Sequence, residues 1–336
     1  MRIVALGELL LRLRAPGAER LLQAPHLEAG FGGSEFNVLA CLSRWGMSTD
    51  YVSALPQAGL GNAALATLHA HGVGTRFVQR AEGRLGLYFL ESGSGVRAPR
   101  VLYDRAGSVF ALSAPATFDW EAILAGAHWL HLSGITPAVS ETAAATAVAA
   151  ARAAQAANVP LSLDINMRAQ LWALSGRDPL ATLAPLLAHA RVVFATPADA
   201  PVCLPAAQRA GSESAAGFAA AIFAHCPRLE LLVSAGKRGA SATDFTLFAS
   251  AQRRGAAIIS GREIVVAAAI ERIGAGDALV AGCLYGLLAG WPEQRWLDFA
   301  LAAQALKHTI PGDINLVSRE EVEAVVGGVS PLRVQR

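Results

Sequence analysis

Short apolar runs alternate with longer helix-like segments along most of the chain. The apolar runs predict buried strands at residues 3–6, 51–54, 129–132, 161–164, 192–195 and 229–233. The segments between them, several of them Ala-rich and amphipathic, predict helices at residues 34–45, 61–71, 140–157, 179–188 and 215–225. This alternation is typical of an α/β fold in which helices cover both faces of a mainly parallel sheet.

Two stretches, residues 9–31 and 84–111, interrupt the alternation. Both lack long helical periodicity and read as short strands joined by Gly, Pro and polar turns. We expect them to form one small accessory sheet, a lid that excludes water from a ligand at the strand ends; ordinary surface hairpins are the alternative. Residues 255–266 predict two more short strands, and residues 278–326 are mainly helical. No internal repeat or linker divides the chain, which predicts a single domain over residues 1–336.

Composition and charge favour small molecules as partners. Of the 336 residues, 53% are hydrophobic and 16% are charged, and the net charge of +2 comes with scattered basic residues. Nothing resembles the basic stripe that a nucleic acid or an anionic membrane requires. A long uncharged stretch, residues 122–140, contains His128, His131, Gly134 and Pro137, so no membrane span is expected there.

The first residues and the cysteines bear on the compartment. Residues 1–13 are interrupted by Glu8 and lack a small-residue cleavage site, which predicts a first strand rather than a signal peptide. The four cysteines are far apart, show no CxxC spacing and lie among apolar residues, which predicts buried thiols rather than disulfides or a zinc site. We therefore expect a cytoplasmic protein.

A short motif with chemical potential, Gly274, Ala275, Gly276 and Asp277, stands directly before the apolar run 278–289. Glycines let a turn bring several backbone N–H groups onto one point, and the first turn of a helix leaves those donors unpaired. An anion is favoured there. If that anion is a phosphoryl group in transfer, Asp277 stands where a base could take the proton of the attacking hydroxyl. A plain glycine-containing helix cap is the alternative.

Several polar residues in the first third of the chain suit a sugar ligand. Gly33 ends a Gly-Gly pair that permits close approach of a polyol, and Asn37 offers both a donor and an acceptor to hydroxyl groups. On the predicted lid, Tyr103 and Arg105 would share one strand face, with Tyr88 on another lid strand. Arg105 could then clamp a carboxylate or a phosphate with two hydrogen bonds. An ordinary helix start and an exposed strand arginine are the alternatives.

Three later loops complete the set. Residues 164–168, Asp-Ile-Asn-Met-Arg, follow a predicted strand directly, and polar residues so dense at a strand end usually serve a site. Residues 234–239, Ser-Ala-Gly-Lys-Arg-Gly, read as a glycine turn suited to a nucleotide passing close to the backbone. Asp313 stands just beyond a predicted helix. For each of them an ordinary loop or turn is the alternative.

In this order the motifs resemble those of the ribokinase-like (PfkB) carbohydrate kinases over the whole chain. The Gly-Gly pair ending at Gly33, together with Asn37, matches the amino-terminal signature, and residues 274–282 match the carboxyl-terminal one. Within that family the chain is most similar to 2-keto-3-deoxygluconate kinases, on the runs 103–108, 131–138, 164–168 with Leu171 and Trp172, and 311–315.

The resemblance implies a three-layer ribokinase-like sandwich and an ATP-dependent kinase that phosphorylates the terminal hydroxyl of a sugar acid, with Mg²⁺ bridging the phosphates. It implies that Asp277 is the base and that the backbone of residues 274–276 is the anion hole. It places Asn166, Ser234, Gly236 and Gly239 beside the nucleotide. It implies that the substrate contacts come from Gly33, Asn37, Tyr88, Tyr103, Arg105, Arg168 and Asp313. Paired arginines fit a sugar acid, because a buried carboxylate needs charge-assisted partners.

The chain departs from the family pattern at two places. These kinases usually carry an Asn-x-x-Glu motif that helps to organise the magnesium–phosphate region, whereas residues 196–199 here read Thr-Pro-Ala-Asp. Asp199 is then the candidate metal ligand. Glu271 stands where the family usually has Asp ahead of the glycine-rich motif. A sensor that binds a sugar acid or a nucleotide without efficient catalysis is therefore one alternative, and a kinase for a neutral sugar such as fructose is another.

A nicotinamide dehydrogenase would use the same kind of sheet. However, no GxGxxG follows the first predicted strand, where Gly7, Glu8 and Leu9 stand instead, so this alternative ranks last. An accessory sheet with one apolar face would also provide a surface for a homo-oligomer formed through the lid.

Overall fold

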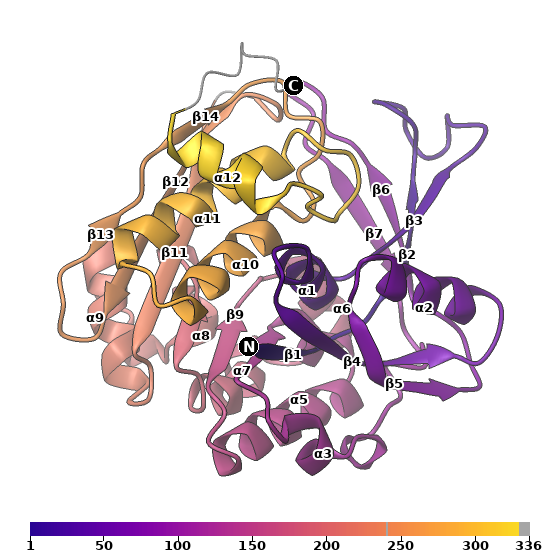
Figure 1. Ribbon diagram of the computed structural model, residues 1–336, viewed down its shortest axis with the longest axis horizontal. Coiled ribbons are helices and arrows are strands. Elements are labelled where there is room, and N and C mark those ends of the chain that lie inside the picture. Colours follow the sequence, from indigo (N-terminus) through magenta and orange to yellow (C-terminus); the bar gives the residue numbers. More distant parts are fainter. Residues whose placement is uncertain (240, 329–336) are drawn as a thin grey trace.

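The computed structural model describes residues 1–239 and 241–328 and contains two sheets (Figure 1). The large sheet has ten strands, nine of them in the order β13-β12-β11-β10-β9-β8-β1-β4-β5, with β14 paired to β12. Its strands are β1 (Arg2–Leu6), β4 (Ser48–Pro56), β5 (Gly74–Ala81), β8 (Trp129–Ser133), β9 (Leu161–Asp164), β10 (Val192–Phe194), β11 (Leu231–Arg238), β12 (Phe245–Arg253), β13 (Ile259–Ser260) and β14 (Ile264–Val266). The neighbours from β5 to β11 run parallel, and β12 pairs antiparallel to β11, β13 and β14.

Burial on both faces of this sheet explains its apolar strands. In β1 the four residues from Ile3 to Leu6 are completely buried, and Ile3 and Val4 belong to different hydrophobic clusters. A strand that packs against helices on both sides needs apolar side chains at successive positions rather than at alternate ones. The predicted α/β class and mainly parallel sheet are confirmed.

Helices form the two outer layers (Figure 1). One layer belongs to the cluster around Trp296 and contains α1 (Ser34–Arg44), α2 (Leu60–Ala70), α10 (Ala275–Leu288), α11 (Glu293–Lys307) and α12 (Arg319–Val326). The other belongs to the cluster around Phe218 and contains α3 (Trp120–Leu124), α4 (Ile135–Val139), α5 (Glu141–Ala156), α6 (Ala169–Ser175), α7 (Pro179–Leu187), α8 (Ala200–Cys203) and α9 (Ala215–His225). Within the described residues, no helix combines the length and the apolar character needed to span a bilayer.

The small sheet unites the two stretches that interrupt the alternation. Its strand order is β3 (Glu28–Gly32), β2 (Leu10–Arg14), β6 (Leu87–Glu91) and β7 (Arg100–Asp104). The central pair, β2 and β6, is parallel, and the outer pairs are antiparallel. One accessory sheet built from residues 9–31 and 84–111 is thus confirmed.

The glycine turn predicted at residues 234–239 is wrong. Strand β11 continues through these residues to Arg238 and pairs with β12, with Gly236 opposite Phe248. A β-carbon at position 236 would lie 2.5 Å from the tip of the Phe248 ring. The chain does not turn at Gly236; the glycine instead leaves room for the partly exposed Phe248 ring, which lies across the strand pair.

Close approach of two helices shapes the layer that carries the glycine-rich motif. Helices α10 and α11 pack together, and a β-carbon at Gly286 would stand only 2.1 Å from the Cβ of Trp296. Trp296 is completely buried, so neither backbone can move away without disturbing the core.

Gly286→Ala should therefore destabilise the protein although alanine is the better helix former. We expect a loss of about 1–3 kcal/mol in the free energy of unfolding, the usual cost of overpacking, measured by urea denaturation. Gly276→Ala in the same helix is the matched control, because a β-carbon there meets nothing within 4 Å. The control should be neutral or stabilising; equal destabilisation by both variants would contradict the proposed clash.

Candidate active site

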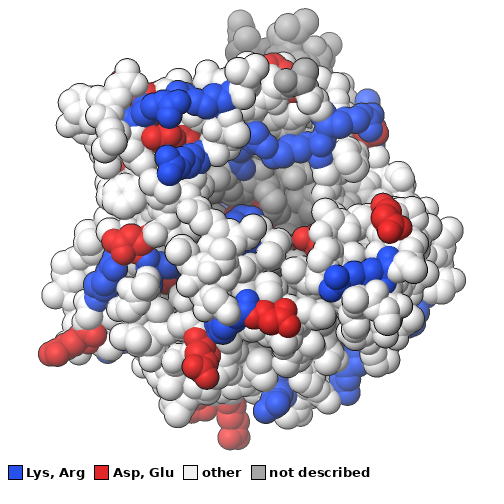
Figure 2. Space-filling model, turned by 180° about the vertical axis from the view of Figure 1, so that it is seen from behind, with Lys and Arg blue, Asp and Glu red and all other residues white. Residues whose placement is uncertain are grey.

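A cavity of about 670 Å³ lies between the carboxyl ends of the parallel strands, the small sheet and the first turns of α1 and α10. Figure 2 shows this face of the molecule hollowed, with Lys and Arg side chains along the rim. Most of the predicted site residues line the cavity: Gly33, Asn37, Tyr88, Tyr103, Arg105, Asn166, Arg168, Asp199, Gly236, Gly274, Ala275, Gly276, Asp277 and Asp313.

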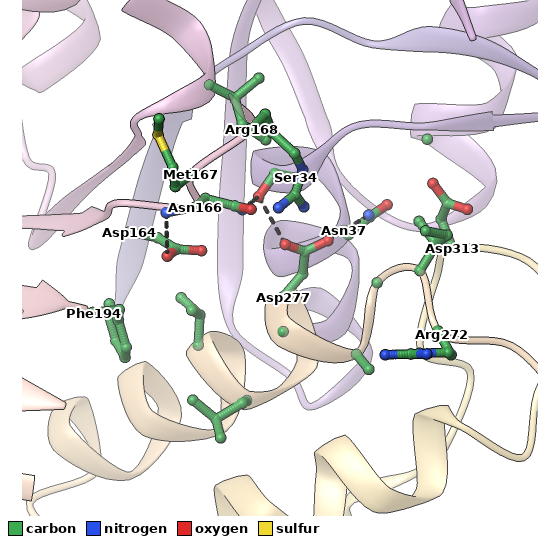
Figure 3. Close-up of a pocket in the computed structure, with 18 of the residues that line it drawn as sticks. Ser34, Asn37, Asp164, Asn166, Met167, Arg168, Phe194, Arg272, Asp277 and Asp313 are labelled. Atoms are coloured by element: carbon green, nitrogen blue, oxygen red, sulfur yellow. Dashed lines mark hydrogen bonds between the residues drawn. The ribbon is translucent and has the colours of Figure 1, made fainter. Parts of the chain in front are cut away.

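Asp277 lies in the first turn of α10 and is held by two donors from α1 (Figure 3). The Ser34 hydroxyl donates to Oδ1 and the Asn37 amide donates to Oδ2, each at 2.7 Å. Burial raises the pKa of Asp277, and these two hydrogen bonds act against that rise. The carboxylate is thus fixed in one orientation, with its ionised form favoured by its donors.

Asn166 extends this arrangement to the end of β9. Its amide donates to the Ser34 hydroxyl at 2.9 Å, so that Asn166, Ser34 and Asp277 form a chain of hydrogen bonds (Figure 3). Asn166 has a left-handed φ of 42°, and its backbone N–H donates to the Asp164 carboxylate at 3.1 Å. Sequence reasoning missed Ser34, although it stands inside the motif that supplies Gly33 and Asn37.

The first turn of α10 has the geometry of an anion site. Gly274 precedes it in a left-handed conformation with φ of 80°, and a β-carbon there would lie 1.7 Å from the Asp313 carbonyl oxygen. Only glycine fits this approach. The backbone N–H groups at the start of the helix have no acceptor within the helix and carry the positive end of its dipole.

Asp313 lies at the centre of a buried ionic cluster beneath the small sheet. The Tyr88 hydroxyl donates to one of its oxygens and the Arg12 guanidinium to the other, and Arg12 also binds Glu271. Burial raises the pKa of Asp313, while Arg12 opposes the rise. Arg12 was not predicted, because only the pairing of β2 with β6 brings it opposite Tyr88.

Arg105 has a buried acidic partner, contrary to the surface partner considered from the sequence. Its Nε and Nη2 lie 2.7 and 2.6 Å from Glu8 Oε2, and the Ser108 hydroxyl also donates to Glu8. Strand β7 ends at Asp104, so Arg105 is positioned by this ion pair rather than by strand alternation. It lines the cavity, but much of its charge is already matched.

Two predicted nucleotide contacts do not reach the cavity lining. The Ser234 hydroxyl donates to the Ala195 carbonyl at 2.5 Å, which ties β11 to the segment after β10. Gly239 lies beyond the end of β11, where a β-carbon would be 2.5 Å from the Asp244 carbonyl oxygen. The residues of this segment that line the cavity are Ala235, Gly236 and Lys237.

Carboxylates at two strand ends offer oxygens for a metal ion. Asp199 accepts from the backbone and hydroxyl of Thr196 through Oδ2, at 2.8 and 2.9 Å, which closes a capping box. Asp164 accepts from Asn166 through Oδ1, and burial, with Asp277 second, raises its pKa to about 8. In the part of the chain that is described, no group of three or more acidic, His or Cys side chains forms a complete metal cage. Two carboxylates fit Mg²⁺, which keeps several waters and binds substrate phosphates.

Known proteins share both the sequence pattern and the architecture. The family model for the pfkB family carbohydrate kinases matches residues 1–319. A 2-dehydro-3-deoxygalactonokinase of Haloferax volcanii is 32% identical over 334 residues, which cover 97% of this chain and 96% of the relative. The crystal structure of 2-dehydro-3-deoxygluconokinase from Thermotoga maritima is 32% identical, with a TM-score of 0.91 over 98% of each chain.

A third similarity points the same way. The crystal structure of a protein from Enterococcus faecalis described as a 2-keto-3-deoxygluconate kinase is 27% identical, with a TM-score of 0.90 over 100% of this chain and 99% of the other. The similarity therefore spans the large sheet, the small sheet and the glycine-rich helix start alike. The Asp277 carboxylate is held by hydrogen bonds in the first turn of α10, and the family model matches nearly the whole chain. The chain therefore belongs to the pfkB family of carbohydrate kinases.

Proposed function

We propose that the protein is an ATP-dependent kinase that phosphorylates the terminal primary hydroxyl of 2-keto-3-deoxygluconate or a close sugar acid. The observation that carries the proposal is the Asp277 carboxylate, fixed by Ser34 and Asn37 beside the unpaired N–H groups of α10. The names of the relatives from Haloferax volcanii and Thermotoga maritima support a ketodeoxy sugar acid as the acceptor. A reaction that consumes ATP also fits the cytoplasm.

The chemistry follows from this placement. Asp277 accepts the proton of the sugar hydroxyl as its oxygen forms a bond to the γ-phosphorus, while the bond from that phosphorus to the bridging oxygen of ADP breaks. The N–H groups of the first turn of α10 stabilise the charge on the transferred group. The products are the phosphorylated sugar, ADP and a proton on Asp277, which later passes to solvent.

Mg²⁺ would supply positive charge to the phosphates when bound, and Asp164 and Asp199 are the side chains that would hold it or its waters. The replacement of the usual amide and Glu by Thr196 and Asp199 leaves one carboxylate at this place. Because Asp199 Oδ2 is occupied by Thr196, one Asp199 oxygen remains for the ion.

Arg168 is the side chain best placed to bind the substrate carboxylate. It lines the cavity, and within residues 1–239 and 241–328 it forms none of the ion pairs. Arg105 adds a second cation, which Glu8 partly neutralises. Among the described residues, the buried Asn37 Oδ1 also lacks a hydrogen-bond partner, so it can accept from a sugar hydroxyl.

The small sheet would act as the lid, because Tyr88 and Tyr103 cover the sugar side of the cavity. Its other face is apolar and partly exposed, with Leu13 opposite Phe89 and Phe89 opposite Leu102. A second copy of the chain is the partner that we propose for this face. The alternatives are a kinase for a neutral sugar and a sensor without efficient catalysis. The hydrogen bonds from Ser34 and Asn37 that orient Asp277 argue against the sensor, because binding alone needs no oriented base.

Asp277→Asn should lower kcat by about a hundredfold or more, because the amide cannot accept the hydroxyl proton. ADP release with sugar acids as acceptors measures the effect, and nucleotide binding should stay near the wild-type value. Near-normal turnover would exclude Asp277 as the base.

Ser34→Ala should move the acidic limb of the kcat–pH profile to higher pH. Ser34 lowers the pKa of Asp277 by donating to its ionised form, so removing the hydroxyl raises that pKa, and the active base is lost at a higher pH as pH falls. Ser43→Ala on the same helix is the control, because Ser43 instead donates to the Gly72 carbonyl. An unmoved limb in Ser34→Ala would argue against the hydrogen bond.

Arg168→Met should raise KM for sugar acids by about tenfold to a hundredfold, as expected for a lost charge-assisted hydrogen bond, and leave KM for a neutral ketose unchanged. The two acceptors are compared in one steady-state assay on the same protein preparation. An equal rise for both acceptors would remove Arg168 from carboxylate recognition.

A further inference from the structure

Two cations from distant segments converge on one aromatic ring at the edge of the cavity. Lys237 comes from β11 and Arg272 from the loop before α10, and both line the cavity. The Lys237 Nζ lies 5.5 Å and the Arg272 Cζ 5.7 Å from the ring centroid of Phe245. Phe245 is buried and its ring is also packed edge-on against His308, with centroids 4.9 Å apart, so the ring is a fixed support.

Neither cation has an acidic partner in the described part of the chain. The nearest acid in sequence, Glu271, binds Arg12 with its side chain and accepts from the backbone N–H of Arg272 at 2.9 Å. By contrast, Arg238, the next residue along β11, is paired with Glu263. No carboxylate of the described residues therefore neutralises Lys237 or Arg272, although both line the same cavity.

Such a pair is electrostatically unfavourable until an anion binds. Desolvation of Lys237 in the cavity, together with repulsion from Arg272 and Arg168, lowers its pKa to about 8. Cation–π contact with Phe245 compensates part of the cost and holds both heads in place. A surface lysine or arginine that only faces water would need neither contact with the Phe245 ring nor a second cation beside it.

We propose that Lys237 and Arg272 form a phosphate-binding pair that holds the polyphosphate of the nucleotide. Arg272 stands two residues before Gly274, so the pair continues the anion site at the start of α10 toward β11. The inference rests on ATP as the phosphoryl donor. Its distinct consequence is that side chains supply charge to the phosphates independently of a metal ion, so ATP binds even when the metal is removed.

Metal-free ATP binding tests the pair on the full-length protein. Isothermal titration with ATP in excess EDTA compares the wild type with Lys237→Met, Arg272→Met and Arg272→Lys. We expect the wild type to bind, each Met variant to lose about tenfold or more in affinity, and Arg272→Lys to keep most of it. Arg238→Met is the matched control, because it removes the same net charge one residue away and should stay within about twofold.

Adenosine separates phosphate recognition from folding. Its affinity should be equal in the wild type and all variants, since adenosine carries no phosphate, and a variant that loses adenosine binding too would count against a phosphate role. If ATP with Mg²⁺ binds well but the metal-free affinities of all variants equal that of the wild type, the pair is refuted and the kinase proposal stands. If the wild type binds no ATP with or without Mg²⁺, ATP is not the phosphoryl donor, and the proposed role of Lys237 and Arg272 is refuted together with it.

Discussion

One buried carboxylate joins two helix starts that lie far apart in the sequence, and the arrangement of the cavity depends on it. Asp277, in the first turn of α10, accepts from Ser34 and Asn37 in the first turns of α1, across 243 and 240 residues. A buried carboxylate without donors would be costly, so this contact both orients the proposed base and fixes the two helices relative to each other. Asn166 holds Ser34 in turn and links the end of β9 to the same point. The end of β9, the two helix starts and the Asp277 carboxylate are thus positioned by a single network.

The small sheet is attached to this centre by two buried arginines that form three ion pairs. Arg12 on β2 binds Asp313 and Glu271, and Arg105 just after β7 binds Glu8. Each partner belongs to the body of the protein and lies next to the cavity or directly before α10. Breaking any of these pairs would leave a buried charge without compensation, so the contacts hold the small sheet against the body of the protein. Asp313 connects these ion pairs with the start of α10, because its backbone carbonyl also lies against Gly274.

The sequence was sufficient for the parallel strands, the accessory sheet and most of the cavity lining, because these follow from local periodicity and from strand ends. Ion pairs between residues far apart in the sequence could not be predicted from it. Arg105 and Glu8 are 97 residues apart, and Arg12 and Asp313 are 301 residues apart. Nothing in the local pattern distinguishes a free arginine from one with a buried partner, so Arg105 was assigned to the substrate alone. The turn predicted around Gly236 was wrong for a related reason, since the Phe248 ring that lies against this glycine comes from the neighbouring strand.

The ion pairs under the small sheet also determine which charges remain available in the cavity. Glu271 stands directly beside Arg272 in sequence and would be its natural partner, yet Arg12 and two backbone N–H groups occupy its carboxylate. As long as β2 keeps Arg12 on Glu271, Arg272 stays unpaired and faces the cavity with Lys237. The contact of β2 with Glu271 thus contributes to the positive charge that Arg272 and Lys237 bring to the cavity.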